Sequence, residues 1–394
     1  MFFSRPLTFV NAQVLTPEGR LARTIRIKRG RIDGIDVAPD TGDAIVDLDR
    51  SFVYPGLINA HDHLELNSQP RLKWRETYRN ASEWIADFQP RFDSDPALAV
   101  TRPETLDDRV WVGGLKNLLA GVTTVCHHNP MHRVLRRRFP VRVVERFGYS
   151  HSLHIDGEAV RVSHRKTPSE WPWMIHAGEG LDDAARAELD TFDRLGCLAA
   201  NTVFIHGVAF CHDAADRVIA AGAGLVWCPS SNHFLFDATA DVRAFDDADC
   251  LALGSDSRLS GERDLLDELR SAHATRQLSA EGLARTIGSG AAKLLKLEDG
   301  GGLAVGARAD LAVFRAIDTC PFDTLVGASR GDVRLTMISG EPAVAEPSLA
   351  GVFEANDIEH SPALLDGSPR LVARWIARHV LKMQLAEPGF EVLN

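Results

Sequence analysis

Two histidines separated by one residue, His61 and His63, are the first feature of this sequence that could bind a metal ion. Residues i and i+2 at the end of a strand can aim both imidazoles at one point, and imidazole is a common zinc ligand. The chain has 15 histidines among 394 residues, so one such pair can arise by chance and is weak evidence alone. Its context is more informative, because the pair directly follows an apolar run at 57–60.

Three more polar residues follow apolar, strand-like runs later in the chain, namely His176, His206 and Asp256. Each alone has an ordinary explanation: a histidine that ends a strand is often structural, and an aspartate between two serines often caps a helix. In a barrel of parallel strands, however, the carboxyl ends of the strands meet on one face. Together with the histidine pair, these residues therefore predict a metal site.

Glu179 lies three residues after His176 in the sequence. A general base or a proton shuttle must lie within hydrogen-bonding reach of the group that it serves. A carboxylate at such a position is, by itself, more often a first-turn residue of a helix, where the helix dipole stabilises its charge. Its place one short turn beyond a candidate ligand favours a role in proton transfer.

The elements that must position these residues alternate between apolar runs and helical patterns over residues 55–299, which is typical of parallel βα units. We therefore expect an α/β protein with a (β/α)8 TIM-like barrel in this range. The third and fourth strands are the hardest to place, because residues 142–155 must supply both. The other strands are expected at 57–60, 122–126, 173–175, 203–205, 225–227 and 251–253.

Both ends of the chain, at 1–54 and 300–350, contain short alternating runs separated by turn residues. Neither end alone has enough strands to bury a face, so we expect the two ends to form one small β-sandwich beside the barrel. The remaining segment, 351–394, has a helical pattern and is expected to form a helical tail.

The composition excludes several classes of function. The net charge of -10, from 54 acidic and 44 basic residues, gives no electrostatic footprint for nucleic acid. Six widely spaced cysteines without a CxxC pair indicate reduced thiols, and no signal-like or membrane-spanning apolar run is visible. We therefore expect a cytoplasmic protein with a small-molecule substrate and no membrane partner, and a homodimer remains an open arrangement.

The motifs PGLINAHDH, GVTTV, HAGE, CPSSN and LGSDS, together with the strand-end His206, resemble the amidohydrolase superfamily, in the branch of cytosine, guanine and S-adenosylhomocysteine deaminases and triazine hydrolases. The resemblance extends over nearly the whole chain. It implies that Glu179 is a proton shuttle and that His206 hydrogen bonds to the attacking oxygen. It also implies that zinc, or alternatively iron, is bound by His61, His63, His176 and Asp256.

One departure from this family bears on the number of ions. Members with two ions usually bridge them with a carboxylated lysine at the fourth strand, but residues 142–155 contain no lysine. Lys166 is the nearest lysine, and it lies in polar loop sequence. We therefore expect a single divalent ion.

The substrate contacts are predicted only from their positions near strand ends. Glu65, Asn67 and Trp84 follow the first strand in a long connection that could form a lid, and Arg258 follows the last ligand. His127, His128, His151 and His154 follow the second strand or lie at 142–155, although each could instead be structural. The predicted contacts are Glu65, Asn67, Trp84, His128, His154 and Arg258.

Such a site predicts hydrolysis by a metal-activated water, with Asp256 as proton acceptor and Glu179 as proton donor. The expected reaction is the release of ammonia from a small amino-substituted N-heterocycle. Hydrolysis of an amide, a formimino group or a carbon–halogen bond remains an alternative, and a non-catalytic barrel is a more distant one. A deaminase with cysteine-ligated zinc would need a P-C-x-x-C motif, which Cys228 and Pro229 do not provide.

Overall fold

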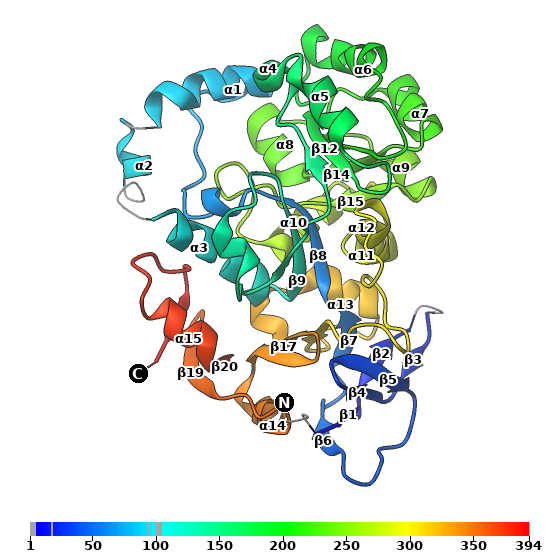
Figure 1. Ribbon diagram of the computed structural model, residues 1–394, viewed down its shortest axis with the longest axis vertical. Helices are drawn as coiled ribbons and strands as arrows, with labels where there is room; N and C mark the ends of the chain where they lie inside the picture. The colour runs from blue at the N-terminus through cyan, green and yellow to red at the C-terminus, as the bar shows by residue number, and fades with distance from the viewer. Residues whose placement is uncertain (1–4, 17–18, 93, 100–104, 394) are drawn as a thin grey trace.

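The computed structural model describes residues 5–16, 19–92, 94–99 and 105–393. Its α/β part lies in the upper half of Figure 1 and contains a three-stranded and a five-stranded parallel sheet, in the orders β10-β9-β8 and β11-β12-β13-β14-β15. The strands are β8 (Leu57–Asp62), β9 (Val122–His127), β10 (Arg142–Val143), β11 (Gly148–Tyr149), β12 (Trp173–Ala177), β13 (Thr202–His206), β14 (Gly224–Trp227) and β15 (Leu251–Leu253). All six strands expected from apolar runs are present.

Helices lie around these strands and connect them in sequence (Figure 1). They are α3 (Leu106–Leu119), α4 (Leu153–Asp156), α5 (Ala159–Lys166), α6 (Asp183–Leu195), α7 (His212–Ala220), α8 (Pro229–Phe236), α9 (Arg243–Asp247), α10 (Leu265–Ala274), α11 (Ala280–Thr286) and α12 (Ser289–Leu294). A long connection after β8 carries η1 (Leu64–Leu66), α1 (Ala81–Phe88), η2 (Gln89–Arg91) and α2 (Pro96–Ala99). Apolar side chains of these strands, such as Ile58, Met174 and Val226, form a buried cluster.

The two parallel sheets meet where the end of β8 lies beside the residues that follow β15. Asp62 and Asp256 form a parallel bridge, and the N–H of Asp256 donates to the carbonyl of His61 at 3.1 Å. Gly254 permits this close approach, because an added Cβ there would lie 2.6 Å from the Cβ of His61. The contact brings residues from the first and last strands of the α/β part together.

The segment 142–155 supplies both β10 and β11, each only two residues long. Four residues separate the two strands, and no helix lies between them. The helices α4 and α5 follow instead, before β12. Strands this short carry too few residues for an alternating or apolar pattern to be visible, which explains why the sequence did not place them.

The two ends of the chain share one sheet in the lower half of Figure 1. Its nine strands run in the order β21-β19-β20-β18-β17-β16-β7-β2-β3, and a separate four-stranded sheet has the order β5-β4-β1-β6. The first strands are β1 (Leu7–Val10), β2 (Gln13–Leu15), β3 (Leu21–Ala22), β4 (Ile25–Lys28), β5 (Arg31–Ile35), β6 (Ala44–Asp47) and β7 (Phe52–Pro55). One hydrophobic cluster joins both sheets, with Phe9 and Ile27 on one side and Val313 and Leu335 on the other.

The strands in the last part of the chain belong to this nine-stranded sheet, and short helices connect them. They are β16 (Leu311–Phe314), α13 (Pro321–Gly327), η4 (Arg330–Asp332), β17 (Val333–Ile338), β18 (Glu341–Ala345), η5 (Pro347–Leu349), α14 (Ala350–Ala355), β19 (His360–Leu365), β20 (Ser368–Ala373), α15 (Arg374–Val380) and β21 (Phe390–Val392). The pairing of β7 with β16, in which Val53 lies opposite Val313, joins the two ends of the chain.

The prediction of a helical tail over 351–394 was wrong. In the described part of this segment, up to residue 393, only α14 and α15 are helical, while β19 and β20 form a hairpin and β21 pairs with β19. The hairpin turn is Asp366-Gly367, with φ of 48° and 77°. An Asp-Gly pair accommodates positive φ at both central positions and matches the twist of the flanking strands, so this local signal outweighed the helical pattern.

No helix in the described ranges is both long and apolar enough to cross a membrane. The longest helix among the described residues, α3, has 14 residues and includes charged side chains. A helix needs about 20 apolar residues to span a bilayer.

Candidate metal centre and active site

Four side-chain atoms converge at the carboxyl ends of β8, β12 and β15. The Nε2 atom of His176 lies 3.3 Å from Nε2 of both His61 and His63, and Oδ1 of Asp256 lies 3.6 and 3.7 Å from the same two atoms. A tetrahedral zinc with bonds of about 2.0 to 2.2 Å separates its ligand atoms by about 3.3 to 3.6 Å. These four separations lie close to that range, so the four residues are a candidate ligand set for a metal ion.

Hydrogen bonds on the far side of two imidazoles leave their Nε2 atoms free to bind. The Nδ1 of His176 lies 2.7 Å from the carbonyl oxygen of His151, which can only accept, so this nitrogen carries the hydrogen. The Nδ1 of His61 lies 3.3 Å from Nδ1 of His128, whose Nε2 in turn donates to the carbonyl of Ser150 at 2.9 Å. Such partners fix the tautomer and the ring orientation of metal-binding histidines.

The two carboxylate oxygens of Asp256 have different contacts. Its Oδ2 accepts hydrogen bonds from the hydroxyls of Ser231 at 2.8 Å and Ser260 at 2.7 Å, while Oδ1 faces the imidazoles. The backbone of Asp256 has φ of 52°, in the left-handed region that non-glycine residues rarely adopt. Backbone strain of this kind is concentrated at functional sites, where the surrounding structure maintains it.

Burial keeps two of the candidate ligands, His63 and His176, uncharged. Removal from water, followed by repulsion from neighbouring imidazoles, lowers the pKa of His63 and His176 well below the usual value of 6.5. Neutral imidazole is the form that binds a metal. On the far side of His63, Nδ2 of Asn129 lies 3.2 Å from Nδ1. An amide nitrogen donates, so this contact favours the tautomer with the hydrogen on Nε2, and binding of an ion would select the other tautomer.

Glu179 and His206 lie next to these four residues. Nε2 of His206 is 3.5 Å from Oε1 of Glu179, and Nδ1 of His206 lies 2.8 Å from Oδ1 of Asn232. Because that oxygen accepts, Nε2 of His206 is left as an acceptor. One ring nitrogen of His206 also lies within 4.8 Å of one from His61 and one from His176, so His206 is in reach of an ion as well.

Burial raises the pKa of Glu179 to about 7, with a further contribution from the charges of Asp256 and Glu188 and an opposing one from His206. A carboxyl group with this pKa holds and releases a proton in the neutral range. General acid and base groups are most efficient when their pKa lies near the working pH. The geometry and the pKa of Glu179 both suit a proton shuttle.

These residues surround a cavity of about 120 Å³. Apolar side chains from the connection after β8, including Leu66, Trp84 and Ile85, close it on one side. Trp84 is held by stacking on Phe88 and by donating from Nε1 to the carbonyl of Leu72 at 3.2 Å. The polar lining includes His63, Asn129, His151, His176, Glu179, His206 and Asp256.

Comparison with known proteins identifies the family. A model described as the amidohydrolase family matches residues 167–343. The 8-oxoguanine deaminase of Pseudomonas aeruginosa is 32% identical over 68% of this chain and 75% of its own. The chain belongs to the amidohydrolase family. It is a metal-dependent hydrolase that acts on C–N bonds.

Two further comparisons cover most of the amidohydrolase chain. The 5-methylthioadenosine/S-adenosylhomocysteine deaminase of Natronomonas pharaonis is 26% identical over 91% of this chain and 98% of its own. The zinc-bound adenosine deaminase from Xanthomonas campestris superposes with a TM-score of 0.68 at 19% identity, over 89% of this chain and 97% of its own. At that identity the superposition shows the fold alone, which is a TIM-like barrel.

The predicted substrate contacts of the amidohydrolase lie in different places. Trp84 lines the cavity beside the metal ligands, and His154 lines an adjoining cavity of about 60 Å³ together with His176 and Glu179. His128 is instead buried behind His61. Glu65 accepts from Asn129. Asn67 is buried beside the metal ligands, where its Nδ2 donates to Asp62 at 2.7 Å.

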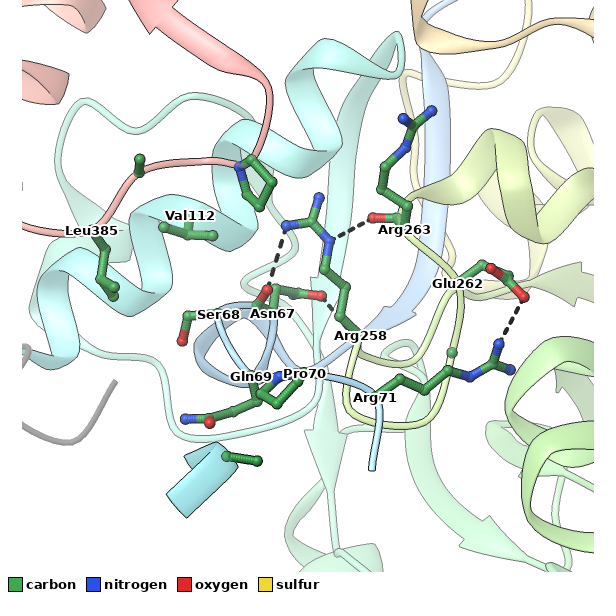
Figure 2. Close-up of a pocket in the computed structure, with 14 residues that line it drawn as sticks. Asn67, Ser68, Gln69, Pro70, Arg71, Val112, Arg258, Glu262, Arg263 and Leu385 are labelled. Atoms are coloured by element: carbon green, nitrogen blue, oxygen red, sulfur yellow. Dashed lines mark hydrogen bonds and ion pairs between the residues drawn. The ribbon is translucent and has the colours of Figure 1, made fainter. Parts of the chain in front are cut away.

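Arg258 is directed away from the metal ligands. Its guanidinium binds both carboxylate oxygens of Glu387, at 2.8 and 2.7 Å, and donates to the carbonyl of Arg263 at 2.8 Å. Figure 2 shows Arg258 in a separate cavity of about 550 Å³, which also contains Asn67 and Arg71 and none of the four candidate ligands. Its guanidinium is already neutralised there, so the structure gives no support to Arg258 as a contact at the metal centre.

Sequence reasoning missed a buried polar network beneath the amidohydrolase site. Lys116 of α3 is fully buried, and its Nζ contacts Oδ2 of Asp62 at 3.3 Å, Oδ1 of Asn67 at 2.7 Å and the hydroxyl of Ser255 at 3.0 Å. Asn117 donates to the same carboxylate oxygen of Asp62 at 2.8 Å. The available signal was a lysine within the otherwise apolar run VWVGGLKNLL.

Proposed function

We propose that this amidohydrolase is an aminohydrolase that releases ammonia from a small amino-substituted N-heterocycle. The observation that carries the proposal is Glu179, a buried carboxyl with a pKa of about 7 beside four converging candidate ligand atoms. The relatives support it by their activities, since they are named as deaminases of 8-oxoguanine and of methylthioadenosine or S-adenosylhomocysteine.

The centre would hold one zinc ion through His61, His63, His176 and Asp256. When bound, such an ion lowers the pKa of a coordinated water to about 7 and so supplies a nucleophile at neutral pH. Zinc is favoured because two structures of the same fold contain it, the adenosine deaminase and an atrazine chlorohydrolase from Arthrobacter aurescens. A single ion is favoured because 142–155, the segment that contains β11, contains no lysine that could bridge two ions.

We assign the proton transfers and the hydrogen bond to the attacking oxygen to Asp256, Glu179 and His206. Asp256 accepts a proton from the attacking water, and His206, whose Nε2 is an acceptor, receives a hydrogen bond from the same oxygen. Glu179 donates its proton to the ring nitrogen beside the carbon under attack, takes up the remaining proton of the attacking oxygen and passes it to the departing amine. The proton held by Asp256 then restores Glu179. The C–N bond breaks, a C=O bond replaces it, and ammonia leaves.

The size of the cavity favours a compact ring. Pockets for drug-sized ligands measure about 300 to 1,000 Å³, whereas the cavity beside the metal ligands measures about 120 Å³. Movement of the connection that carries Trp84 would be needed to admit a nucleoside. We therefore favour a free base or a similar monocyclic or bicyclic heterocycle as substrate.

The direct test is ammonia release by the zinc-loaded protein from a panel of aminopurines, aminopyrimidines, aminopterins and formimino compounds. We expect release from at least one heterocycle, and release about 100-fold to 10,000-fold slower from the Glu179→Gln variant with the same substrate. Amides and halogenated triazines belong in the same panel, because a metal centre of this kind can also hydrolyse those bonds. Turnover confined to formimino compounds, amides or halides would contradict the proposal.

We also infer the domain organisation from the strand pairing. The pairing of β7 with β16 supports a composite domain of residues 1–54 and 300–350, and the hairpin of β19 and β20 adds strands to it. Residues 55–299 would form the barrel, with the bridge between Asp62 and Asp256 joining its first and last strands. In this arrangement the barrel closes between β10 and β11.

A further inference from the structure

A second group of metal-binding side chains lies outside the centre described above. One ligand atom from each of Glu65, His127 and His132 lies within 4.8 Å of the other two. Nε2 of His127 and Oε2 of Glu65 are 3.7 Å apart, beyond the range of a hydrogen bond. The three residues come from η1, from the end of β9 and from the loop before η3 (Arg133–Arg136).

Two of these atoms are buried without a hydrogen-bond partner among the described residues. They are Nε2 of His127, a side chain with no exposed surface, and Oε2 of Glu65. A buried polar atom that lacks a partner costs about 1 to 3 kcal/mol. A cation between the two atoms would satisfy both, because each offers it a lone pair.

We propose that Glu65, His127 and His132 bind a second divalent cation, Zn²⁺, at a site separate from the catalytic centre. Two imidazoles and one carboxylate form a common ligand set for zinc, with water in the fourth position. The 3.7 Å between Nε2 of His127 and Oε2 of Glu65 is close to the separation of about 3.3 to 3.6 Å between ligands of a tetrahedral ion. The single negative charge of this ligand set also favours a dication.

The proposed role requires one particular tautomer of His127. An ion at Nε2 requires the hydrogen on Nδ1. The N–H of Leu64, 3.3 Å from Nδ1, favours the other tautomer. Binding of the cation would select the tautomer with the hydrogen on Nδ1.

The proposed site is connected to the catalytic centre through one side chain. Nδ2 of Asn129 donates to Oε1 of Glu65 and lies 3.2 Å from Nδ1 of His63. The cation would therefore lie on the far side of the His63 imidazole from the catalytic ion. It would hold Glu65 and Asn129 in place behind one catalytic ligand.

The test is the zinc stoichiometry of the full chain, measured by elemental analysis after removal of metal and dialysis against a tenfold excess of Zn²⁺. We expect two equivalents for the wild type and one for His132→Gln and His127→Gln. His132 is only half-buried, so its variant can fold even where a change at the fully buried His127 interferes. His212→Gln, at an exposed position on α7, is the matched control and should keep two equivalents.

The two sites can be distinguished in the same measurement. His61→Ala should lose the catalytic ion and keep the second one, so failure of the proposed function and failure of this proposal give different results. An anomalous difference peak at Nε2 of His127 in zinc-soaked crystals should disappear in His132→Gln. One equivalent in the wild type, or two equivalents in both His127→Gln and His132→Gln, would overturn the second site.

Discussion

Glu179 differs from its neighbours in the centre because its carboxyl has no partner with a fixed charge. Its nearest titratable contact is Nε2 of His206 at 3.5 Å, and burial raises its pKa to about 7. Asp256, by contrast, is fixed by two serine hydroxyls on one oxygen. The two carboxylates therefore suit different roles, one as a mobile proton carrier and the other as a ligand.

Glu179→Gln keeps the shape of the side chain and removes proton transfer. We expect kcat to fall about 100-fold to 10,000-fold, the usual contribution of a general acid or base. Zinc content and substrate affinity should stay near the wild-type values, because Glu179 is not one of the four ligands. A variant that retains more than about a tenth of the wild-type kcat would refute the shuttle role.

His61→Ala and Asp256→Ala each remove one candidate ligand. Both variants should lose the zinc of the catalytic centre, which is one equivalent, together with activity, and elemental analysis after dialysis can measure this loss. Ser231→Ala, which removes only one hydrogen bond to Asp256, should bind zinc more weakly, by about 10-fold to 100-fold as is usual for outer-shell partners. Full zinc retention by both alanine variants of the ligands would contradict the assignment.

At the scale of single residues, the strand pattern explains where three of the candidate ligands lie. His61 and His176 lie near the ends of β8 and β12, and Asp256 lies shortly after the end of β15. Arg258 also follows a strand, but its partner Glu387 is 129 positions away and was not predictable from local sequence. Asn129 and Ser231 reach the ligands from other loops, and only the fold brings them together.

At the scale of elements, α3 is joined to β8 by a buried ion pair. Lys116 and Asp62 have no exposed side-chain surface, and Asp62 is the middle residue between the two histidine ligands. Asn59 and Ser255 also contact the same carboxylate, which links β8 to the residues after β15. This network positions the two strand ends that carry three of the four ligands.

Lys116→Met should destabilise the protein by about 3 to 5 kcal/mol, because it leaves the charge of Asp62 buried without compensation. Zinc affinity should fall as well, since Asp62 lies between His61 and His63. The double variant Asp62→Asn with Lys116→Met removes both charges and should recover most of the stability. If the double variant is as unstable as the single one, the unpaired charge of Asp62 does not cause the destabilisation, and loss of packing explains it instead.

Glu268 links α10 to α8 and makes stability depend on pH. It is fully buried, and burial raises its pKa from 4.5 to about 7, although it accepts hydrogen bonds from the N–H and hydroxyl of Ser230. Between these two values the unfolded chain releases the proton while the folded protein keeps it. Stability therefore falls as pH rises from about 4.5 to 7, and the cost then remains constant.

Glu268→Gln should remove this pH dependence. Relative to the wild type, the variant should gain about 1 to 3 kcal/mol between pH 4.5 and pH 8, at about 1.36 kcal/mol per pKa unit. Denaturant unfolding of both proteins at several pH values measures the difference. The exposed Glu281 on α11 provides the control, and its Gln variant should follow the wild type at every pH. A Glu268→Gln curve parallel to the wild type would show that Glu268 titrates normally.

Among the strands, the apolar sequence pattern was sufficient to predict the longer buried ones. Buried parallel strands such as β12 and β13 are continuous apolar runs, and each was predicted at its observed place. The two-residue strands β10 and β11 exist because neighbouring strands pair with them, so local sequence carries little sign of them. In the hairpin of β19 and β20, the Asp366-Gly367 turn was the usable signal, and the helical pattern concealed it.

At the scale of the whole molecule, the C-terminal segment is joined to the barrel by a buried group of charges. Glu387 has no exposed side-chain surface and binds Arg258 from the loop after β15 and Arg330 from η4, the latter at 2.9 Å. Arg330 also binds Asp366 at 2.6 Å and the carbonyl of Pro388 at 2.6 Å. The contacts connect the last strands of the nine-stranded sheet to the loop that carries a candidate metal ligand.

Glu387→Ala should therefore lower the melting temperature of the whole protein, because two buried guanidinium groups lose their shared partner. Removing one member of such a group costs about 3 to 5 kcal/mol. The matched control is Glu341→Ala, which breaks an exposed pair with Arg138 and should leave the melting temperature unchanged. Zinc content and kcat at 25 °C should be near the wild-type values, since Glu387 lies outside the metal cavity. A loss of kcat with zinc and melting temperature retained would show instead that Arg258 acts in the reaction, and that the contact with Glu387 controls it.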